Sequence, residues 1–263
     1  MDKPKLVPHP TAIIDPGARI AGTAEIGPYC IIGAGVEIEA GTRLMANVYV
    51  EGPTWIGEDN IFYPYSTVGV APQDLKYKGE ASQTRIGRRN KIREFVTIHR
   101  GTEGGGMVTR IGDDNLLMAY VHIAHDAQVG NGTVLGHGAT LGGHVTVGDH
   151  ANVGAFSGVH QFCRVGRNAI VGGYSVITQD VLPFSSTVSE RENHIFGANK
   201  TGLERRGFST ELIEQLQTTF RLLTRAGLNT SQALERIGAE VPSSPELEEL
   251  IAFIRAGKRG FVK

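Results

Sequence analysis

The chain has 263 residues, a formal net charge of −1 and two cysteines, Cys30 and Cys163. A charge so close to zero excludes a global field that would attract nucleic acid or an anionic membrane. The two cysteines lack CxxC spacing, which argues against a disulfide framework or a cysteine-built zinc site and indicates a reducing cytoplasm.

The N-terminal segment, MDKPKLVPHPTAIID, lacks the pattern of a signal peptide. Its basic residues are not followed by an apolar stretch, and no run in the chain approaches transmembrane length. We therefore expect a cytoplasmic protein without a membrane span.

An apolar residue then recurs at every sixth position. The series covers Ile14–Val68 and Ile86–Ile98, shifts by one residue, and continues over Ile111–Ile177. All 25 of these positions are apolar and 24 are aliphatic. A period of six fits neither an α-helix nor an alternating strand. It is typical of a parallel β-helix, in which each hexapeptide forms one short strand and a corner, and each coil buries its aliphatic residues against the next.

Two segments interrupt this series. Residues 70–85, VAPQDLKYKGEASQTR, would place Asp74 and Glu80 at inward positions, so we predict a loop outside the coil. Residues 101–110, GTEGGGMVTR, cause the one-residue shift, and their glycine content predicts a flexible excursion. Long loops on a rigid scaffold usually serve function.

The period becomes helical toward the C-terminus. From 209 the apolar residues follow one helix face up to a predicted C-cap at Gly227. A short second helix is predicted around 231–238. A third begins with Ser244 as its N-cap and Pro245 at the first helical position.

The expected fold class is an all-β solenoid with an added α-helical part. A parallel β-helix of hexapeptide repeats, with three faces and 18 residues per coil, should cover residues 1–190. A small helical domain should follow over residues 191–263. The spacing does not set the handedness of the winding.

The coil arithmetic brings distant polar residues together. With 18 residues per coil, His125 lies under Gly143, which lies under Gln161. One edge of three successive coils then gathers His125, Asp126, Gly143, His144, His160 and Gln161. His122 lies around the preceding corner.

This cluster allows three interpretations. Histidines on the surface of a solenoid can be inert, and several together can bind zinc, although His122 and His125 are only three residues apart. In the third, His125 is a general base polarised by Asp126, and the backbone N–H of Gly143 meets an oxyanion one coil away. A cysteine nucleophile is disfavoured because the coil count does not place Cys163 beside His125.

Three stretches resemble one known family. They are VHIAHDAQVGNGTVLGHGATLGGHVTVGDHANVGAFSGVHQFCRVGRNAIVGG at 121–173, APQDLKYKGE at 71–80 and NKTGLERRGFS at 199–209. In this order they resemble the cytoplasmic UDP-N-acetylglucosamine O-acyltransferases, which begin lipid A synthesis. The resemblance implies a left-handed winding, against the usual crossover rule, and a homotrimer with active sites between subunits. It also implies an acyl carrier protein thioester as donor, with no metal and no other cofactor.

The same resemblance implies roles for particular residues. His125 resembles the general base, Asp126 the group that orients it, and Gly143 the oxyanion donor. The residues that would bind the sugar nucleotide and the acyl chain are Gln73, Asp74, Lys76, His122, His144, His160, Gln161, Gly173, Asn199 and Arg205.

Within that set, Asn199 and Arg205 resemble nucleotide contacts. Thr201 stands where the family often carries an acidic residue, which leaves the ribose or base contact open. Gly173 matches a position that can close the far end of the acyl groove. Since glycine has no side chain, we expect an open groove that accepts about fourteen carbons rather than ten.

The expected reaction is transfer of a 3-hydroxyacyl group from acyl carrier protein to the 3-OH of UDP-N-acetylglucosamine. Two related alternatives are the later UDP-3-O-acylglucosamine N-acyltransferase, whose extra N-terminal domain this chain is too short to hold, and an acyltransferase for a 3-amino sugar nucleotide. Two from other classes are a gamma-type zinc carbonic anhydrase and a non-catalytic solenoid subunit.

An acidic carrier protein would need a local basic patch, because the net charge of the chain is near zero. Arg164 and Arg167 lie near the end of the repeat, and Arg221 and Arg225 share a predicted helix face at i,i+4 spacing. We expect some of these arginines to dock the carrier protein.

Overall fold

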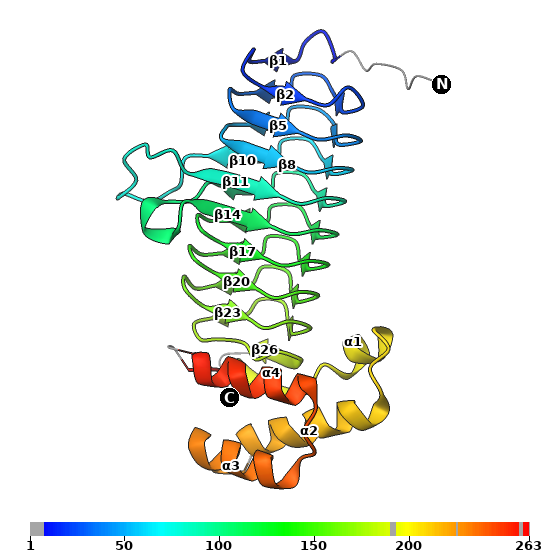
Figure 1. Cartoon of the computed structure of the whole chain (residues 1–263), viewed down its shortest axis with the longest axis vertical. Coiled ribbons are helices and arrows are strands. Elements are labelled where there is room, and N and C mark those ends of the chain that lie inside the picture. The colour runs from blue at the N-terminus through cyan, green and yellow to red at the C-terminus, as the bar shows by residue number, and fades with distance from the viewer. Residues whose placement is uncertain (1–7, 190–192, 225, 258–259, 263) are drawn as a thin grey trace.

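The solenoid expected from the hexapeptides is present in the computed structural model, which describes residues 8–189, 193–224, 226–257 and 260–262. Short strands stack into a tall three-sided prism, with the N-terminal coils at one end and the helices at the other (Figure 1). We call the three sides sheets I, II and III, in the order in which the chain visits them.

Each sheet is a ladder of strands from successive coils. Sheet I contains β1 (Ile13–Ile14), β4 (Ile31–Ile32), β7 (Tyr49–Val50), β10 (Thr67–Val70), β13 (Thr97–His99), β16 (His122–Ile123), β19 (Thr140–Leu141), β22 (Gly158–Val159) and β25 (Val176–Ile177). Sheet II contains β2 (Arg19–Ile20), β5 (Val36–Ile38), β8 (Thr54–Ile56), β11 (Gln83–Ile86), β14 (Val108–Ile111), β17 (Gln128–Val129), β20 (Thr146–Val147) and β23 (Arg164–Val165). Sheet III contains β3 (Glu25–Ile26), β6 (Arg43–Leu44), β9 (Ile61–Phe62), β12 (Lys91–Ile92), β15 (Leu116–Leu117), β18 (Val134–Leu135), β21 (Asn152–Val153), β24 (Ile170–Val171), β26 (Ser185–Ser189) and β27 (Asn193–Ala198). The corners between the sheets form three edges, which we name I/II, II/III and III/I.

The pairing confirms the predicted register. Strands of neighbouring coils run parallel with a step of 18 residues, as in Ile13 with Ile31 and Ile123 with Leu141. The apolar positions of the six-residue series point inward and are buried from Ile26 to Ile177. The first two, Ile14 and Ile20, are only partly buried, because the first coil has no neighbour on one side.

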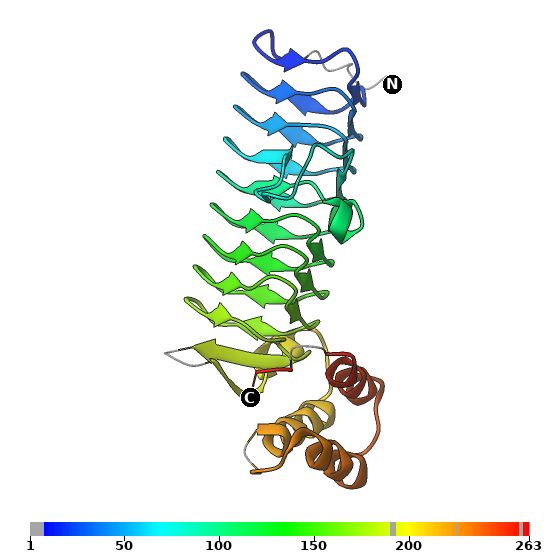
Figure 2. The same cartoon turned by 90° about the vertical axis from the view of Figure 1, so that its left-hand side faces the viewer.

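Both predicted interruptions leave the coil on the same side of the prism (Figures 1 and 2). They are shorter than expected, because the last residues of each predicted loop belong to β11 and β14. Residues 71–82 and 100–107 remain outside the strands. The second excursion has a defined conformation. It contains a 3₁₀ turn (Glu103–Gly105), and Arg100 before it is buried, with Nε donating to the carbonyl of Gly69 (2.7 Å).

The C-terminal part contains helices α1 (Lys200–Arg205), α2 (Thr210–Thr224), α3 (Thr230–Glu240) and α4 (Pro245–Ala256). The predicted cap is confirmed, since the Ser244 hydroxyl accepts from the N–H of Leu247 (3.2 Å). The sequence did not reveal the hairpin β26–β27 or α1, because both are short and follow neither period. The expected domain boundary at 190/191 lies outside the described residues. Within the described chain, none of the helices combines the length and apolar character needed to cross a bilayer.

Two arginines join the helices to the last coils. Arg164 donates to the carboxylate of Asp180 through Nε (2.9 Å) and Nη2 (2.7 Å), and its guanidinium lies 4.1 Å from the ring centre of Phe253 on α4. Arg167 donates to Glu249 on α4 (2.5 Å). These arginines are therefore engaged in contacts within the chain. Arg225 lies outside the described residues, and Arg221 is exposed on α2.

We predict that Arg164→Ala destabilises the fold by about 3 kcal/mol, because the Asp180 side chain, only 3% exposed, would lose its cation. Urea unfolding measures this change. Arg236→Ala is the matched control: its ion pair with Glu240 is about half exposed, so removing it should change the stability very little. Equal effects of the two substitutions would contradict the assignment of Arg164 as a contact that holds the helices to the last coils.

Candidate active site

The I/II edge holds the column that the coil count predicted. The N–H of His144 donates to the carbonyl of His125 (3.0 Å), and the N–H of Phe162 donates to the carbonyl of Gly143 (3.0 Å). These bonds fix His125, Gly143 and Gln161 at equivalent corners of three successive coils. The parallel ladder therefore places residues from three separate parts of the sequence in one short stack.

His125 and Asp126 form a hydrogen-bonded pair. The Nδ1 of His125 lies 2.8 Å from Oδ2 of Asp126, whose side chain is fully buried. Because Asp126 can only accept in its ionised form, this contact places the proton on Nδ1. The lone pair on Nε2 then remains available to take a proton, which is the arrangement of a general base and its orienting carboxylate.

Gly143 lies directly against the ring of His125. A Cβ at position 143 would lie 2.6 Å from Cε1 and 2.7 Å from Nε2 of that ring, so any other residue would push His125 aside. In the described part of the chain, no acceptor takes the N–H of Gly143. Glycine therefore keeps both the imidazole position and an amide donor next to it.

A pocket of about 530 Å³ opens in front of this pair, over sheet I. Its lining includes six residues singled out from the sequence, which are Gln73, His122, His125, Gly143, His160 and Gln161. The rest of its wall is the outer surface of sheet I, where glycines and the exposed side chain of Val176 provide an apolar floor. The pocket therefore combines a polar end with an apolar floor.

His99 also lines the pocket and was missed from the sequence. It is buried and meets the ring of His122 edge-on, with 4.8 Å between ring centres. Burial, helped by the charges of His122 and His125, lowers the pKa of His99 to about 4. The signal was available: pairing Ile98 with Ile123 across the second loop places His99 opposite Ala124, next to His125.

His122 and His144 also favour the neutral form. Burial lowers the pKa of His122 and of His144, although the negative charges of Asp126 and Asp74 act in the opposite direction on His144. The Nδ1 of His122 lies 2.7 Å from the hydroxyl of Thr97. His144 stacks on Phe162, with 4.3 Å between ring centres.

The remaining predicted residues do not line this pocket. In the first loop, Asp74 accepts from the N–H of Lys76 (2.9 Å), and the Lys76 side chain points into solvent. Gly173 lies on the III/I edge. Asn199 caps α1 by accepting from Gly202 and donates to the carbonyl of Asn168 on the II/III edge (3.0 Å).

Arg205 is exposed on α1. Within one chain, therefore, the expected base, the acyl-groove residue and the nucleotide contacts occupy three different edges of the prism. The fold of one chain therefore separates residues that the sequence resemblance assigned to one site.

The cluster of His125, Asp126 and His144 could also hold a metal ion, since their ligand atoms lie within 4.8 Å of one another. Both carboxylate oxygens of Asp126 already accept hydrogen bonds, from Thr102 and from His125. A metal ion would have to displace these bonds. The geometry therefore favours the histidine–carboxylate pair over the zinc alternative.

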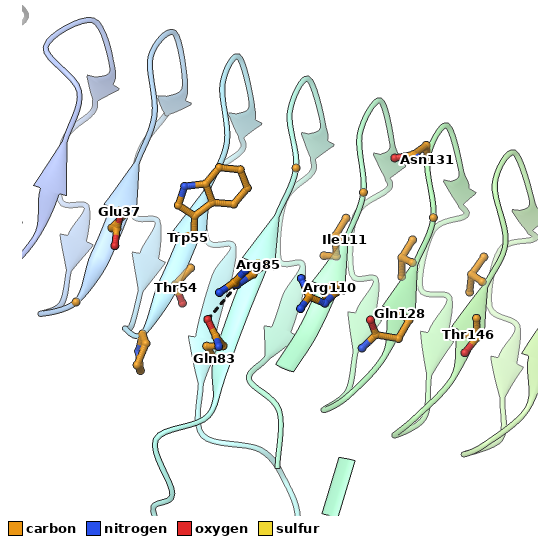
Figure 3. A pocket seen from close by; sticks show the side chains of 17 residues that line it. Glu37, Thr54, Trp55, Gln83, Arg85, Arg110, Ile111, Gln128, Asn131 and Thr146 are labelled. Carbon is orange, nitrogen blue, oxygen red and sulfur yellow. Dashed lines mark hydrogen bonds between the residues drawn. The ribbon is translucent and has the colours of Figure 1, made fainter. Parts of the chain in front are cut away.

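A larger depression of about 780 Å³ lies on sheet II (Figure 3). Arg85 and Arg110 face outward there as register partners on β11 and β14, and Arg85 donates to Gln83 (3.0 Å). Its lining contains no histidine, cysteine or serine that could act as a base or nucleophile. The chemistry is therefore assigned to the histidine pocket.

Comparison with known proteins gives one consistent family. A model described as UDP N-acetylglucosamine O-acyltransferase, domain 2, matches residues 180–262, and one for bacterial transferase hexapeptides matches 9–40, 109–143 and 144–179. A curated relative from Thermodesulfovibrio yellowstonii, an acyl-[acyl-carrier-protein]–UDP-N-acetylglucosamine O-acyltransferase, is 47% identical over 97% of this chain and 98% of its own length.

Solved structures agree with this relationship. LpxA from Acinetobacter baumannii is 43% identical with a TM-score of 0.94, and covers 97% of this chain and 99% of its own. LpxA from Bacteroides fragilis, a UDP-N-acetylglucosamine acyltransferase, is 41% identical with the same TM-score and coverage. These matches support the expected left-handed parallel β-helix.

We predict that His99 makes the fold less stable in acid. In the unfolded chain a histidine takes a proton near pH 6.5, whereas folded His99 does so only near pH 4, so between these values the unfolded state binds more protons. Stability should fall by about 2 kcal/mol between pH 7 and pH 5 on account of His99 alone. Urea unfolding of His99→Gln should lack that part of the pH dependence. His9→Gln, at an exposed position, should keep it, and an unchanged slope in His99→Gln would refute the assignment.

Proposed function

This chain belongs to the acyl-[acyl-carrier-protein]–UDP-N-acetylglucosamine O-acyltransferase family, and we propose that it transfers a 3-hydroxyacyl group from acyl carrier protein to the 3-OH of UDP-N-acetylglucosamine. It is an acyltransferase of lipid A biosynthesis. The observation that carries the mechanism is the His125–Asp126 pair, which lies beside Gly143 at the polar end of a pocket with an apolar floor. Since its donor is a cytoplasmic carrier protein, we propose that the reaction takes place in the cytoplasm.

In the proposed reaction, Nε2 of His125 takes the proton of the sugar hydroxyl as its oxygen attacks the thioester carbon. The carbonyl oxygen becomes an oxyanion and accepts the N–H of Gly143. When the carbon–sulfur bond breaks, the departing thiolate receives the proton from His125. Asp126 holds the ring and stabilises the imidazolium formed in between.

The family relationship argues against the two rivals from other classes. Neither a gamma-type carbonic anhydrase nor a non-catalytic solenoid accounts for a relative with 47% identity that is named an acyltransferase. The N-acyltransferase and the 3-amino-sugar acceptor differ in product, since they give an amide rather than an ester. Mass spectrometry of the product and its hydrolysis in mild alkali separate these outcomes.

We propose a homotrimer, because the site residues of one chain lie on different edges. If three prisms place their III/I edges at a common axis, sheet I of one subunit faces sheet III of the next. The I/II edge of the first subunit, with His125, then meets the II/III edge of its neighbour, where Asn199 contacts Asn168. In that arrangement Arg205 of the neighbour completes the nucleotide site.

An exposed column of aromatic side chains on the III/I edge supports this axis. Tyr65, Phe95 and Tyr120 stack on one another with ring centres 4.8 to 5.0 Å apart, and Phe156 stacks on Tyr174 at 5.2 Å. Each of the five is at least 42% exposed. An apolar strip of this length on a water-facing edge is typical of a protein–protein interface.

We also propose that Gly173 sets the length of the acyl groove. Its φ lies outside the left-handed region, so the backbone conformation does not demand glycine. A Cβ would lie tightly against the carbonyl oxygen of Ala155, at 3.2 Å. The chain continues directly into β25, whose Val176 and Ile177 line the histidine pocket. A side chain at 173 would therefore reach toward the far end of that pocket.

The first test of the function uses UDP-N-acetylglucosamine with a mixture of hydroxyacyl carrier proteins and identifies the product by mass spectrometry. The expected product is the 3-O-hydroxyacyl ester. His125→Ala should lower turnover at least about 100-fold while the protein stays folded. Near-normal turnover in a folded His125→Ala protein would overturn the mechanism, and absence of the ester with the wild type would overturn the function.

A site shared between subunits predicts that trimers mixed from two impaired variants regain activity. Co-assembly of His125→Ala and Arg205→Ala chains brings an intact His125 and an intact Arg205 together at about a quarter of the interfaces if assembly is random. Turnover at low UDP-N-acetylglucosamine should then exceed that of either variant alone. If each site lay within one chain, mixing would restore nothing.

We predict that Gly173→Met shifts donor preference toward shorter chains. Losing room for three or four methylenes changes selectivity by about 2 to 3 kcal/mol, since each buried methylene contributes about 0.8 kcal/mol. The measurement is kcat/KM for donors of ten, twelve and fourteen carbons. Gly22→Met, where a side chain meets open space on a distant coil, is the control. A folded Gly173→Met protein with the parental ranking would refute the assignment.

A further inference from the structure

The second excursion, residues 100–107, folds back onto the carboxylate of Asp126. Its 3₁₀ turn (Glu103–Gly105) would normally be capped by the side chain of the preceding residue, Thr102, but that hydroxyl makes no cap. It donates instead to Oδ2 of Asp126 (2.6 Å), and the backbone N–H of Thr102 donates to Oδ1 (2.9 Å). One residue of the loop therefore satisfies both oxygens of the carboxylate.

The glycines of the loop allow this close approach. A Cβ on Gly105 would lie 1.9 Å from Cγ of Asp126, and one on Gly101 would lie 2.8 Å from its Oδ1. Neither glycine has a left-handed φ, so space rather than backbone conformation requires glycine there. Thr102 is itself buried, as is Gly101 before it. The loop thus closes the side of Asp126 that faces away from His125.

The carboxylate needs such a restraint because two imidazoles lie near the same oxygen. Oδ2 of Asp126 is 2.8 Å from Nδ1 of His125 and 4.0 Å from Nε2 of His144. The backbone of Asp126 is held separately, by its N–H donating to the buried hydroxyl of Thr109 (2.8 Å). Once the backbone is held, rotation of the carboxylate is the remaining freedom, and the two donors of Thr102 oppose it.

We infer that Thr102 is the positioning residue of the catalytic pair: it locks the Asp126 carboxylate toward His125, and the glycine-rich excursion exists to deliver it there. This inference rests on the proposed function, in which His125 is the base. Thr102 acts through Asp126 and does not touch the reacting atoms.

The test compares the steady-state kinetics of wild type, Thr102→Val and Thr102→Ser. Valine keeps the shape and the backbone N–H but removes the hydroxyl donor, so kcat should fall roughly 10- to 100-fold, as expected when a catalytic group loses its orientation. KM for both substrates should stay within about twofold. Serine restores the donor and should recover most of kcat. Thr102→Ala, which is smaller, repeats the test if valine disturbs the loop.

Thr42→Val is the matched control. Thr42 is also buried, and its hydroxyl donates to the carbonyl of Gly57 (2.7 Å), but on a distant coil. This variant should keep kcat. If it lowers kcat as much as Thr102→Val does, the loss belongs to the missing buried hydroxyl in general, and the inference fails.

A double variant separates positioning from a general structural effect. If Thr102 acts only through Asp126, Thr102→Val should lower kcat by less than about twofold in an Asp126→Ala background. The inference would be overturned if the losses of kcat from Thr102→Val and Asp126→Ala multiplied in the double variant. It would also be overturned if Thr102→Val kept the wild-type kcat. Both outcomes require an active wild type, so they are distinct from failure of the proposed function, in which the wild type makes no ester.

Discussion

The stacking of one inward apolar side chain per hexapeptide is the constraint on which the rest of this structure depends. Each coil buries its three inward residues against the coils above and below, so the parallel register cannot slip without exposing a whole column. The outward strand positions carry no such load and can take polar residues, among them His122 and Arg164. A rigid frame of this kind is well suited to hold a catalytic group at a fixed height.

The frame also buries several polar side chains near the I/II edge. His99, His122 and His144 lie against the sheet, where desolvation disfavours their charged forms. His125 differs in its partner, because its Nδ1–H donates to the buried carboxylate of Asp126. Four similar side chains thus have different chemical roles, and the difference comes from their neighbours rather than from residue type.

The two excursions supply contacts to the pocket and to Asp126 that regular coils cannot make. The loop of residues 71–82 brings Gln73 to the mouth of the pocket, and that of residues 100–107 covers Asp126 from behind. The prism separates the other expected contacts onto different edges, with Gly173 on one and Asn199 near another. These positions come together only in the proposed trimer, where the edges of neighbouring prisms meet.

The sequence by itself determined the coil, its 18-residue register and the stack of His125, Gly143 and Gln161, because a strict six-residue period leaves one way to bury the aliphatic positions. It also determined the N-cap of the last helix, Ser244, which depends on local residues. It did not determine the role of His99, the anchoring of Thr102 or the ion pairs of Arg164 and Arg167. These depend on contacts across loops and between distant segments. Once a loop breaks the period, counting residues no longer gives distances, and only the folded chain decides which side chains meet.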